Sequence, residues 1–316
     1  MVTIIVAIYN PIWVKLRATL ISILNQKDIH FEIIIADDGS KCIHKEKIIE
    51  LFNKHSFTEY SFSILPHNKG TCWNYYSALV LSKYDYVKAL SPGDLFYDDF
   101  TLTKWYRFAK DNDAEICFGE PVLYEEKTHC IINGVHNPRF LEPYELKRVS
   151  LQKKNYLLIP DPILGASIIT KRNVAIKNVE KILDHVKYCE DYFIKLHVLN
   201  GGKISYFRNN VIWYEYGLGV STNSQWKSFV KGDKIECAKI LINEDICDWR
   251  WKMIWKHQIA TGDLPKYRML LFPTIIPYIL KKKTKVFDRR SGDIDNSKLE
   301  TLFLSEYWGT ESDASN

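Results

Sequence analysis

Two short apolar runs near the N-terminus constrain the fold of this chain most strongly. They are Val2-Thr3-Ile4-Ile5-Val6-Ala7-Ile8 and Phe31-Glu32-Ile33-Ile34-Ile35-Ala36. Such β-branched runs are typical of strands that are buried on both faces of a parallel sheet. Between them, apolar residues recur at helical spacing from residue 16 to residue 24. The sequence therefore predicts a strand, a helix and a second strand at the start of the chain.

The same alternation continues over roughly the first 220 residues. Helical patterns cover 43–52, 73–80 and 100–109, and two more helices follow residue 169, the second of them opening at residues 188–191. Strands alternating with helices predict an α/β fold with a doubly wound, mostly parallel sheet flanked by helices. The further strands are expected at residues 61–65, 86–90, 116–118, 122–124, 165–169, 204–207 and 211–216.

Composition excludes several classes of protein. A hydrophobic content of 46% in 316 residues is ample for a globular core, and a net charge of +5 is too mild for a dedicated nucleic-acid binder. Seven cysteines without a CxxC pair favour buried or incidental thiols in a reducing compartment. No secretory signal pattern and no run of about 20 apolar residues is seen. We therefore expect a cytoplasmic protein.

Acidic residues follow two of the predicted strands. Asp37-Asp38-Gly39-Ser40 comes after the second strand and Ser91-Pro92-Gly93-Asp94 after the fourth. The carboxyl ends of parallel strands share one edge of the sheet, where ligands bind in open α/β folds. Adjacent carboxylates are costly to bury unless polar groups meet them. Taken alone, the first tetrapeptide equally fits a turn whose Ser40 or Asp side chain caps the next helix.

Five segments together resemble the family-two glycosyltransferases of the GT-A fold. They are Val6-Ala7-Ile8-Tyr9-Asn10, Ala36-Asp37-Asp38-Gly39-Ser40, Asn68-Lys69-Gly70, Leu90-Ser91-Pro92-Gly93-Asp94 and Glu190-Asp191. Their order and separations carry the resemblance, which fades after Ser221. It implies an inverting transferase that moves a sugar from a nucleoside diphosphate sugar, usually a UDP-hexose, to a hydroxyl of a glycan acceptor.

The resemblance also implies where the nucleotide would bind. The Asp38 carboxylate would hold the base and ribose together with the backbone around Tyr9, while Asp37 would support the turn. The segment that follows the third strand would lie against the nucleotide. The residues so implied are Ala7, Ile8, Tyr9, Asp37, Asp38, Asn68, Lys69 and Gly70.

The fourth strand ends where the family holds a divalent cation, manganese or magnesium, on the donor diphosphate. The family often has two or three acids there, whereas this chain has Ser91, Pro92 and Gly93 before the single carboxylate of Asp94. Either Asp94 binds the metal with water and diphosphate, or metal dependence is weak. We favour the first, because magnesium commonly uses one or two carboxylates plus substrate phosphates. Ser91 and Gly93 would then belong to the nucleotide-sugar site.

The acidic pair Glu190-Asp191 falls where the family places its general base. An inverting displacement needs one base to take the proton of the acceptor hydroxyl. Asp191 would be that base, with Glu190 beside it in the nucleotide-sugar site. Carboxylates in the first turn of a helix also suit the helix dipole, so the pair equally fits a cap.

The C-terminal third has a different character. The apolar residues 270–280 run into the basic residues 281–285, which fits peripheral contact with an anionic bilayer or, equally, a helix packed on the catalytic domain. Residues 217–222 fit a mobile loop that closes over the donor or a plain hairpin turn, and Trp213 and Tyr214 fit sugar stacking or core. We expect a catalytic domain at 1–222, a helical extension at 223–300 and a partly disordered tail at 301–316.

No motif in the sequence identifies the acceptor. We expect a bacterial surface glycan, for example a lipid-linked oligosaccharide of capsule or O-antigen type, or a glycoprotein glycan. The helical extension would contact the acceptor, the membrane or a second copy of the chain.

The alternative to a glycosyltransferase is a non-catalytic nucleotide-sugar-binding module, which the single acid at Asp94 permits. Glu190-Asp191 argues against it, since a pure binder needs no base. A nucleotidyltransferase ranks last, because no glycine-rich loop follows the first strand.

Overall fold

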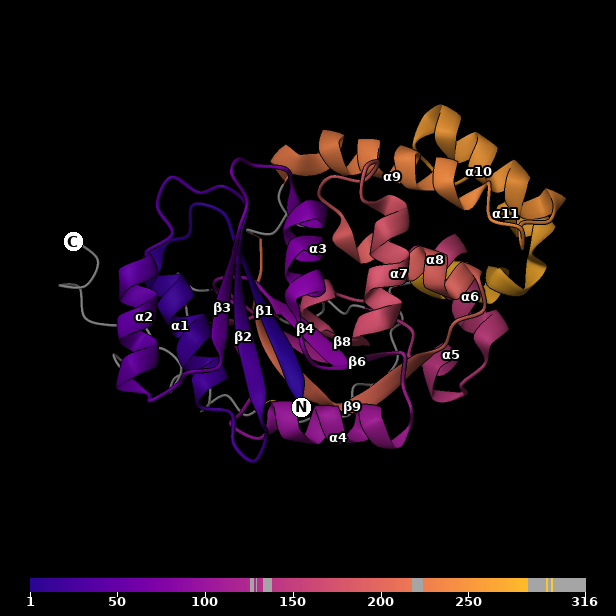
Figure 1. Cartoon of the computed structure of the whole chain (residues 1–316). Coiled ribbons are helices and arrows are strands. Elements are labelled where there is room, and N and C mark those ends of the chain that lie inside the picture. Colours follow the sequence, from indigo (N-terminus) through magenta and orange to yellow (C-terminus); the bar gives the residue numbers. More distant parts are fainter. Residues whose placement is uncertain are drawn as a thin grey trace.

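The computed structural model describes residues 1–125, 128, 130–132, 138–217, 224–283, 294 and 297. These residues form one mixed sheet with helices on both faces and a group of helices after it (Figure 1). The strand order is β3-β2-β1-β4-β8-β6-β9-β5, with β7 paired to β6. The predicted α/β fold with a helical C-terminal part is confirmed.

The strands are β1 Val2–Ile8, β2 Phe31–Asp37, β3 Tyr60–Ile64, β4 Tyr86–Leu90, β5 Leu95–Phe96, β6 Ile116–Glu125, β7 Cys130–Ile131, β8 Ile168–Lys171 and β9 Ile204–Glu215. The helices are α1 Trp13–Leu24, α2 Lys45–Lys54, α3 Thr71–Leu81, α4 Thr101–Asp111, α5 Glu142–Glu145, α6 Val149–Leu158, α7 Arg172–Ile182, α8 Phe193–Leu199, α9 Lys227–Leu241, α10 Trp249–Thr261, α11 Arg268–Leu271 and α12 Ile276–Lys283. Short 3₁₀ turns are η1 Gly165–Ser167, η2 Glu190–Tyr192, η3 Ser224–Trp226 and η4 Pro273–Ile275.

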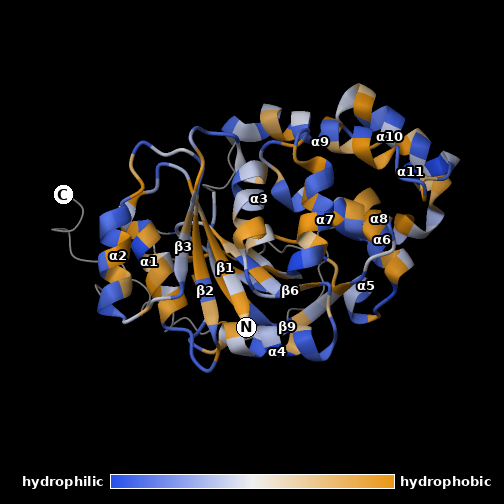
Figure 2. Cartoon of the chain, in the orientation of Figure 1, coloured by the Kyte–Doolittle hydropathy of each residue, from blue (hydrophilic) through white to orange (hydrophobic). Residues whose placement is uncertain are grey.

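The side chains of β1 divide between two hydrophobic cores, because neighbouring residues of a strand point to opposite faces of the sheet. Ile4 and Val6 pack with α1, α2 and α4, whereas Ile5 packs with α3, α6, α7 and α8. Figure 2 shows the apolar residues concentrated on the central strands and on the helix sides that face them. Burial on both faces explains why these strands are almost entirely apolar.

Strand direction changes across the sheet. β3, β2, β1 and β4 are mutually parallel, as the sequence predicts, and β6 is parallel to β9. β8 is antiparallel to both β4 and β6, and β5 is antiparallel to β9. The sheet is therefore parallel in its N-terminal half and mixed beyond β4.

Three predicted strand boundaries were wrong. Residues 116–118 and 122–124 belong to one strand, β6, whose register with β9 shifts between Phe118 and Pro121. Residues 204–207 and 211–216 likewise form the single strand β9, which ends at Glu215. The strand expected at 165–169 begins only at Ile168, after the turn η1. A bulge keeps a strand continuous across a local irregularity, which a break in the apolar pattern does not reveal.

The C-terminal helices pack on the core that contains α3, α6, α7 and α8. Side chains from α9, α10, η4 and α12 extend this core, and the Tyr278 ring lies 5.5 Å from the Phe140 ring. Lys282 Nζ donates to the carbonyl oxygens of Ile159 and Pro160 at 3.0 and 2.8 Å. A helix packed on the rest of the protein is thus observed. Contact with a membrane and the proposed domain boundaries stay predictions.

Some predictions fall on residues that the structure leaves undescribed. The loop residues 218–222, the basic residues 284 and 285 and the tail 301–316 lie outside the described ranges. None of the described helices combines the length and the apolar composition that a membrane span needs. All seven cysteines are free thiols, as expected.

Candidate active site

A cavity of about 190 Å³ lies at the carboxyl edge of the sheet. Five of the predicted site residues line it: Ala7 at the end of β1, Ser91 and Asp94 after β4, and Glu190 and Asp191 in η2. The other lining residues are Thr71, Tyr75, Ala89, Leu90, Leu164, Gly165, Ala166, Tyr188, Cys189 and Tyr214. The structure thus brings the acids of two distant segments to one cavity.

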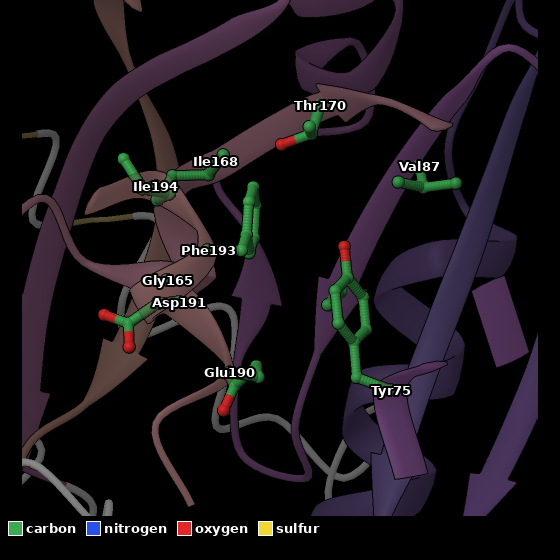
Figure 3. A pocket seen from close by; sticks show the side chains of 10 residues that line it. Tyr75, Val87, Gly165, Ile168, Thr170, Glu190, Asp191, Phe193 and Ile194 are labelled. Atoms are coloured by element: carbon green, nitrogen blue, oxygen red, sulfur yellow. The ribbon is translucent and has the colours of Figure 1, made fainter. Parts of the chain in front are cut away.

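A narrower recess of about 30 Å³ shares part of this lining (Figure 3). Glu190 and Asp191 line both spaces, as do Tyr75 from α3 and Gly165 from η1. Apart from Thr170, the rest of its wall is apolar and includes Val87, Ile168, Phe193 and Ile194 (Figure 3). The acidic pair therefore stands between the cavity, which also holds Asp94, and a mainly hydrophobic recess.

Asp37 links the loops that follow β1 and β2. Its carboxylate accepts a hydrogen bond from the Ser40 amide at 3.0 Å and another from the Ser40 hydroxyl. The Asn10 amide donates to Ser40 Oγ at 2.6 Å, and Asn10 Oδ1 accepts from the Lys41 amide at 3.0 Å. Asp37 is fully buried inside this turn and does not line the cavity.

Asp38 holds the loop that follows β3. Its carboxylate accepts hydrogen bonds from the amides of Lys69 and Gly70 at 2.7 and 2.9 Å, and its own amide donates to the Ile8 carbonyl. Only 4% of Asp38 is exposed. Burial raises the pKa of this carboxyl, and the two amide donors oppose that rise. Contact of Asp38 with a base or ribose stays a prediction.

The remaining predicted nucleotide residues lie around this loop and outside the cavity lining. Tyr9 is exposed, Ile8 is buried, and Asn68 and Lys69 are half-buried. Gly70 has φ +95°, and a Cβ there would lie 2.5 Å from the Lys187 carbonyl oxygen. The start of α3 therefore touches the backbone of the segment that leads to Glu190.

The turn after β4 is held by hydrogen bonds to two other elements and by one within the turn. The Gly93 amide donates to Thr19 Oγ1 of α1 at 3.0 Å, and the Gly93 carbonyl accepts from the Tyr124 hydroxyl of β6 at 2.6 Å. Within the turn, the Asp94 amide donates to the Ser91 carbonyl at 3.0 Å. This turn presents Asp94 to the cavity.

Three charged side chains lie close to this turn, those of Lys88, Lys15 and Glu215. Lys88 of β4 is fully buried, donates to the carbonyls of Ala89 and Ala166, and interacts electrostatically with Asp94. Burial raises the pKa of Asp94 and lowers the pKa of Lys88, and their attraction opposes both shifts. Glu215 is ion-paired with Lys15 and repels Asp94.

A divalent cation fits this donor set only with help from a substrate. Within the described ranges, no group of three or more His, Cys, Asp or Glu side chains could hold a metal ion. Asp94 does offer a carboxylate to the cavity. Since magnesium often takes one or two carboxylates plus substrate phosphates, a diphosphate would have to supply the remaining oxygens.

The acidic pair in η2 is half-buried. Burial raises the pKa of Glu190, and the neighbouring Asp191 raises it further. Burial likewise raises the pKa of Asp191, which the ammonium of Lys195 opposes. Both carboxyls therefore hold a proton to higher pH than free carboxyls do, a property suited to a general base or acid.

The sequence did not predict the roles of Lys88 and Asp233. Lys88 was visible as a lysine inside the apolar run of β4, a position where a charge requires a partner. Asp233 of α9 is buried and accepts amide hydrogen bonds from residues 187–189. Asp233 lies four residues before Cys237 and eight before Leu241, which are both buried on the same helix. The helical repeat therefore puts Asp233 on the buried face of α9.

The predicted aromatic pair on β9 separates in the structure. Trp213 is fully buried, and its ring stacks on Tyr97 with centroids 5.1 Å apart. Tyr214 lines the cavity. Trp213 is thus part of the core, and only Tyr214 is placed to meet a ligand.

Comparison with known proteins gives the family. The family described as Glycosyl transferase family 2 matches residues 3–172, more than half of the chain. This chain belongs to glycosyltransferase family 2, and the predicted GT-A fold is confirmed. No curated protein matches the chain in sequence.

Solved structures with the same fold include TarS 1-349 from S. aureus. Its complex with UDP-GlcNAc has 15% identity and a TM-score of 0.54, covering 98% of this chain and 92% of that chain. Its complex with UDP has 14% identity and a TM-score of 0.51 over the same shares. A mannosyltransferase from Pyrobaculum calidifontis, in complex with GDP-Man and Mn2+, has 13% identity and a TM-score of 0.49, covering 98% of this chain and 88% of that chain.

We expect Asp38→Asn to destabilise the protein by about 1–3 kcal/mol, because one buried amide loses its acceptor. Denaturant unfolding measures the change in free energy. Asp99→Asn is the matched control, since Asp99 forms an ion pair with Lys27 at the surface and its loss costs about 0–1 kcal/mol. Equal stability of the two variants would contradict the structural role of Asp38.

Proposed function

We propose that this protein is an inverting glycosyltransferase that moves a hexose from a nucleoside diphosphate sugar to a hydroxyl of a glycan acceptor. One observation carries the proposal: Asp94 and the pair Glu190-Asp191 line the same cavity at the carboxyl edge of the sheet. Ligands bind at this edge in open α/β folds. TarS is described with UDP and UDP-GlcNAc, which makes a uridine diphosphate sugar the first donor to test.

In the proposed reaction, Asp191 removes the proton from the acceptor hydroxyl. The acceptor oxygen then forms a bond to the anomeric carbon, and the bond from that carbon to the diphosphate oxygen breaks on the opposite face. A general base contributes a factor of about 10²–10⁴ to such a step. A manganese or magnesium ion, held by Asp94 and the diphosphate, would neutralise charge on the leaving group.

Aromatic residues beside the cavity support a glycan acceptor. Tyr188 lines the cavity, and its ring lies 5.0 and 5.5 Å from the rings of Trp226 and Phe229. Phe229 is 51% exposed. Exposed aromatic faces at a cavity are suited to stack on the apolar face of a sugar ring. The acceptor would then approach from the side of α9.

A screen of nucleotide sugars for hydrolysis and transfer, with manganese and with a chelator, tests the proposal. We expect one donor to be turned over, and Asp191→Asn to lower kcat by about 10²–10⁴-fold while UDP or GDP still binds. Glu142→Gln, on the half-exposed α5, is the control and should keep wild-type kcat. Nucleotide-sugar binding without any turnover would favour the non-catalytic binding module instead. Wild-type turnover in Asp191→Asn would remove the assigned base, and full activity in the chelator would remove the metal.

The raised pKa values of Glu190 and Asp191 predict the pH dependence of turnover. A base works only when it is deprotonated, so activity is lost as pH falls through its raised pKa. An ordinary aspartate has a pKa of about 3.9. We expect the acidic limb of kcat to lie well above that pH. Because the two carboxyls interact, the limb reports the pair. A kcat that stays constant down to about pH 4 would contradict this prediction.

We also propose that α10 to α12 contact the inner face of an anionic membrane, where a lipid-linked acceptor would lie. Leu270 is 82% exposed, and Trp249, Met253, Ile276 and Leu280 are exposed as well. Residues 249–283 contain one acid, Asp263, and eight basic residues, Arg250, Lys252, Lys256, Lys266, Arg268, Lys281, Lys282 and Lys283. Exposed apolar side chains with basic neighbours suit an interfacial contact.

Flotation with vesicles of phosphatidylglycerol and phosphatidylcholine tests this contact. We expect the wild-type protein to float with the anionic vesicles. The double variant that carries both Leu270→Glu and Leu280→Glu should remain in solution. Val80→Glu, at an exposed apolar position of α3, is the matched control and should float. Absence of wild-type flotation, with full activity on a soluble acceptor, would refute the membrane contact alone.

A further inference from the structure

A single buried carboxylate from α9 holds the segment that leads into Glu190 and Asp191. Asp233 accepts hydrogen bonds from the amides of Lys187 at 3.0 Å, Tyr188 at 2.7 Å and Cys189 at 2.9 Å. It is 5% exposed. Three amide donors stabilise a desolvated carboxylate strongly, and charge-assisted hydrogen bonds of this kind are about twice as strong as neutral ones. The backbone of residues 187–189 is thereby fixed to α9.

The opposite side of this segment contacts the start of α3. The Lys187 carbonyl accepts a hydrogen bond from the Cys72 amide at 3.2 Å, and Gly70 leaves no room for a Cβ against Lys187. The amides of Lys69 and Gly70 are held in turn by Asp38. Residues 187–189 are therefore held between the start of α3 and helix α9.

Asp233 lies outside the cavity lining, whereas Tyr188 and Cys189, whose amides it binds, are part of that lining. Its position in the chain is also outside residues 3–172, which match the family. Asp233 can therefore influence the chemistry only through the backbone that it holds and through its charge. It is a positioning residue in this sense.

We propose that Asp233 positions the carboxylate of Asp191 for proton transfer and makes α9 a structural part of the active centre. The proposal rests on the proposed function, in which Asp191 is the general base. Catalytic groups must be held close to the productive geometry, and a misplacement of about 1 Å can cost about 100-fold in rate. Loss of the three hydrogen bonds would release the segment on which Asp191 is placed.

The charge of Asp233 also acts on the acidic pair. It raises the pKa of Glu190 and of Asp191, together with burial. Among the described residues, the other ionisable groups found to interact with Asp191 are Glu190 and Cys189 on its own segment, Lys195 on α8, Cys72 on α3, Tyr156 on α6, Tyr192 in η2 and Cys237 on α9. Lys195 is the cation among them, and it opposes the rise. Removing the Asp233 charge leaves the others in place and lowers both carboxyl pKa values.

Asp233→Asn keeps the shape of the side chain and removes its charge, so it tests the proposal directly. With the donor that the wild-type enzyme uses, we expect kcat to fall by about 10- to 100-fold with unchanged donor KM. The acidic limb of kcat should also shift to lower pH, which a merely structural residue would not cause. Glu236→Gln is the matched control, because Glu236 lies on α9 and pairs with Lys239 at the surface. Equal kcat and equal pH profiles in the two variants would overturn the proposal.

Hydrogen exchange on the wild-type protein is a second test, which does not require Asp233→Asn to fold. The amides of residues 187–189 should exchange as slowly as those of the neighbouring core, because each donates to a buried acceptor. Unprotected exchange there would overturn the proposal. Wild-type turnover in Asp191→Asn would instead overturn the assigned base. A loss of turnover in Asp191→Asn alone, with Asp233→Asn as active as Glu236→Gln, would overturn only the positioning role of Asp233.

Discussion

Hydrogen bonds from backbone amides to buried carboxylates hold several loops of this protein in place. Asp38 binds the amides of residues 69 and 70, Asp161 those of residues 139 and 140, and Asp233 those of residues 187–189. A buried carboxylate without donors would cost several kcal/mol, so each of these acids ties one loop to a fixed place. The contacts of Asp233 fix part of the cavity wall, because Tyr188 and Cys189 belong to the lining.

The same contacts join parts of the chain that are far apart in sequence. Asp38 follows β2, its amide partners precede α3, the start of α3 contacts Lys187, and Lys187 is held by Asp233 of α9. The segment that leads to Glu190 and Asp191 is therefore held by α3 and by α9. This continuity is the physical basis of the proposed role of α9, which lies outside the matched family region.

The first four strands could be predicted because their signal is local. Runs such as Val2–Ile8 are apolar at every position except Thr3, which is what burial on both faces favours. The direction of β8 and the continuity of β6 could not be predicted in this way. A Cβ at Gly119 would come within 2.2 Å of Val211 Cγ1, so the irregularity in β6 depends on a residue 92 positions away. Composition does not encode such a contact.

The sequence by itself determined that Asp37, Asp38 and Asp94 stand at one edge of the sheet, because each directly ends or follows a parallel strand. Only the tertiary structure decided what these acids meet there. Asp38 faces backbone amides, Asp94 shares its surroundings with Lys88 and Glu215, and the segment before Asp191 is held by Asp233. Burial and electrostatic energy depend on distances in space, and the partners come from segments that no local pattern connects.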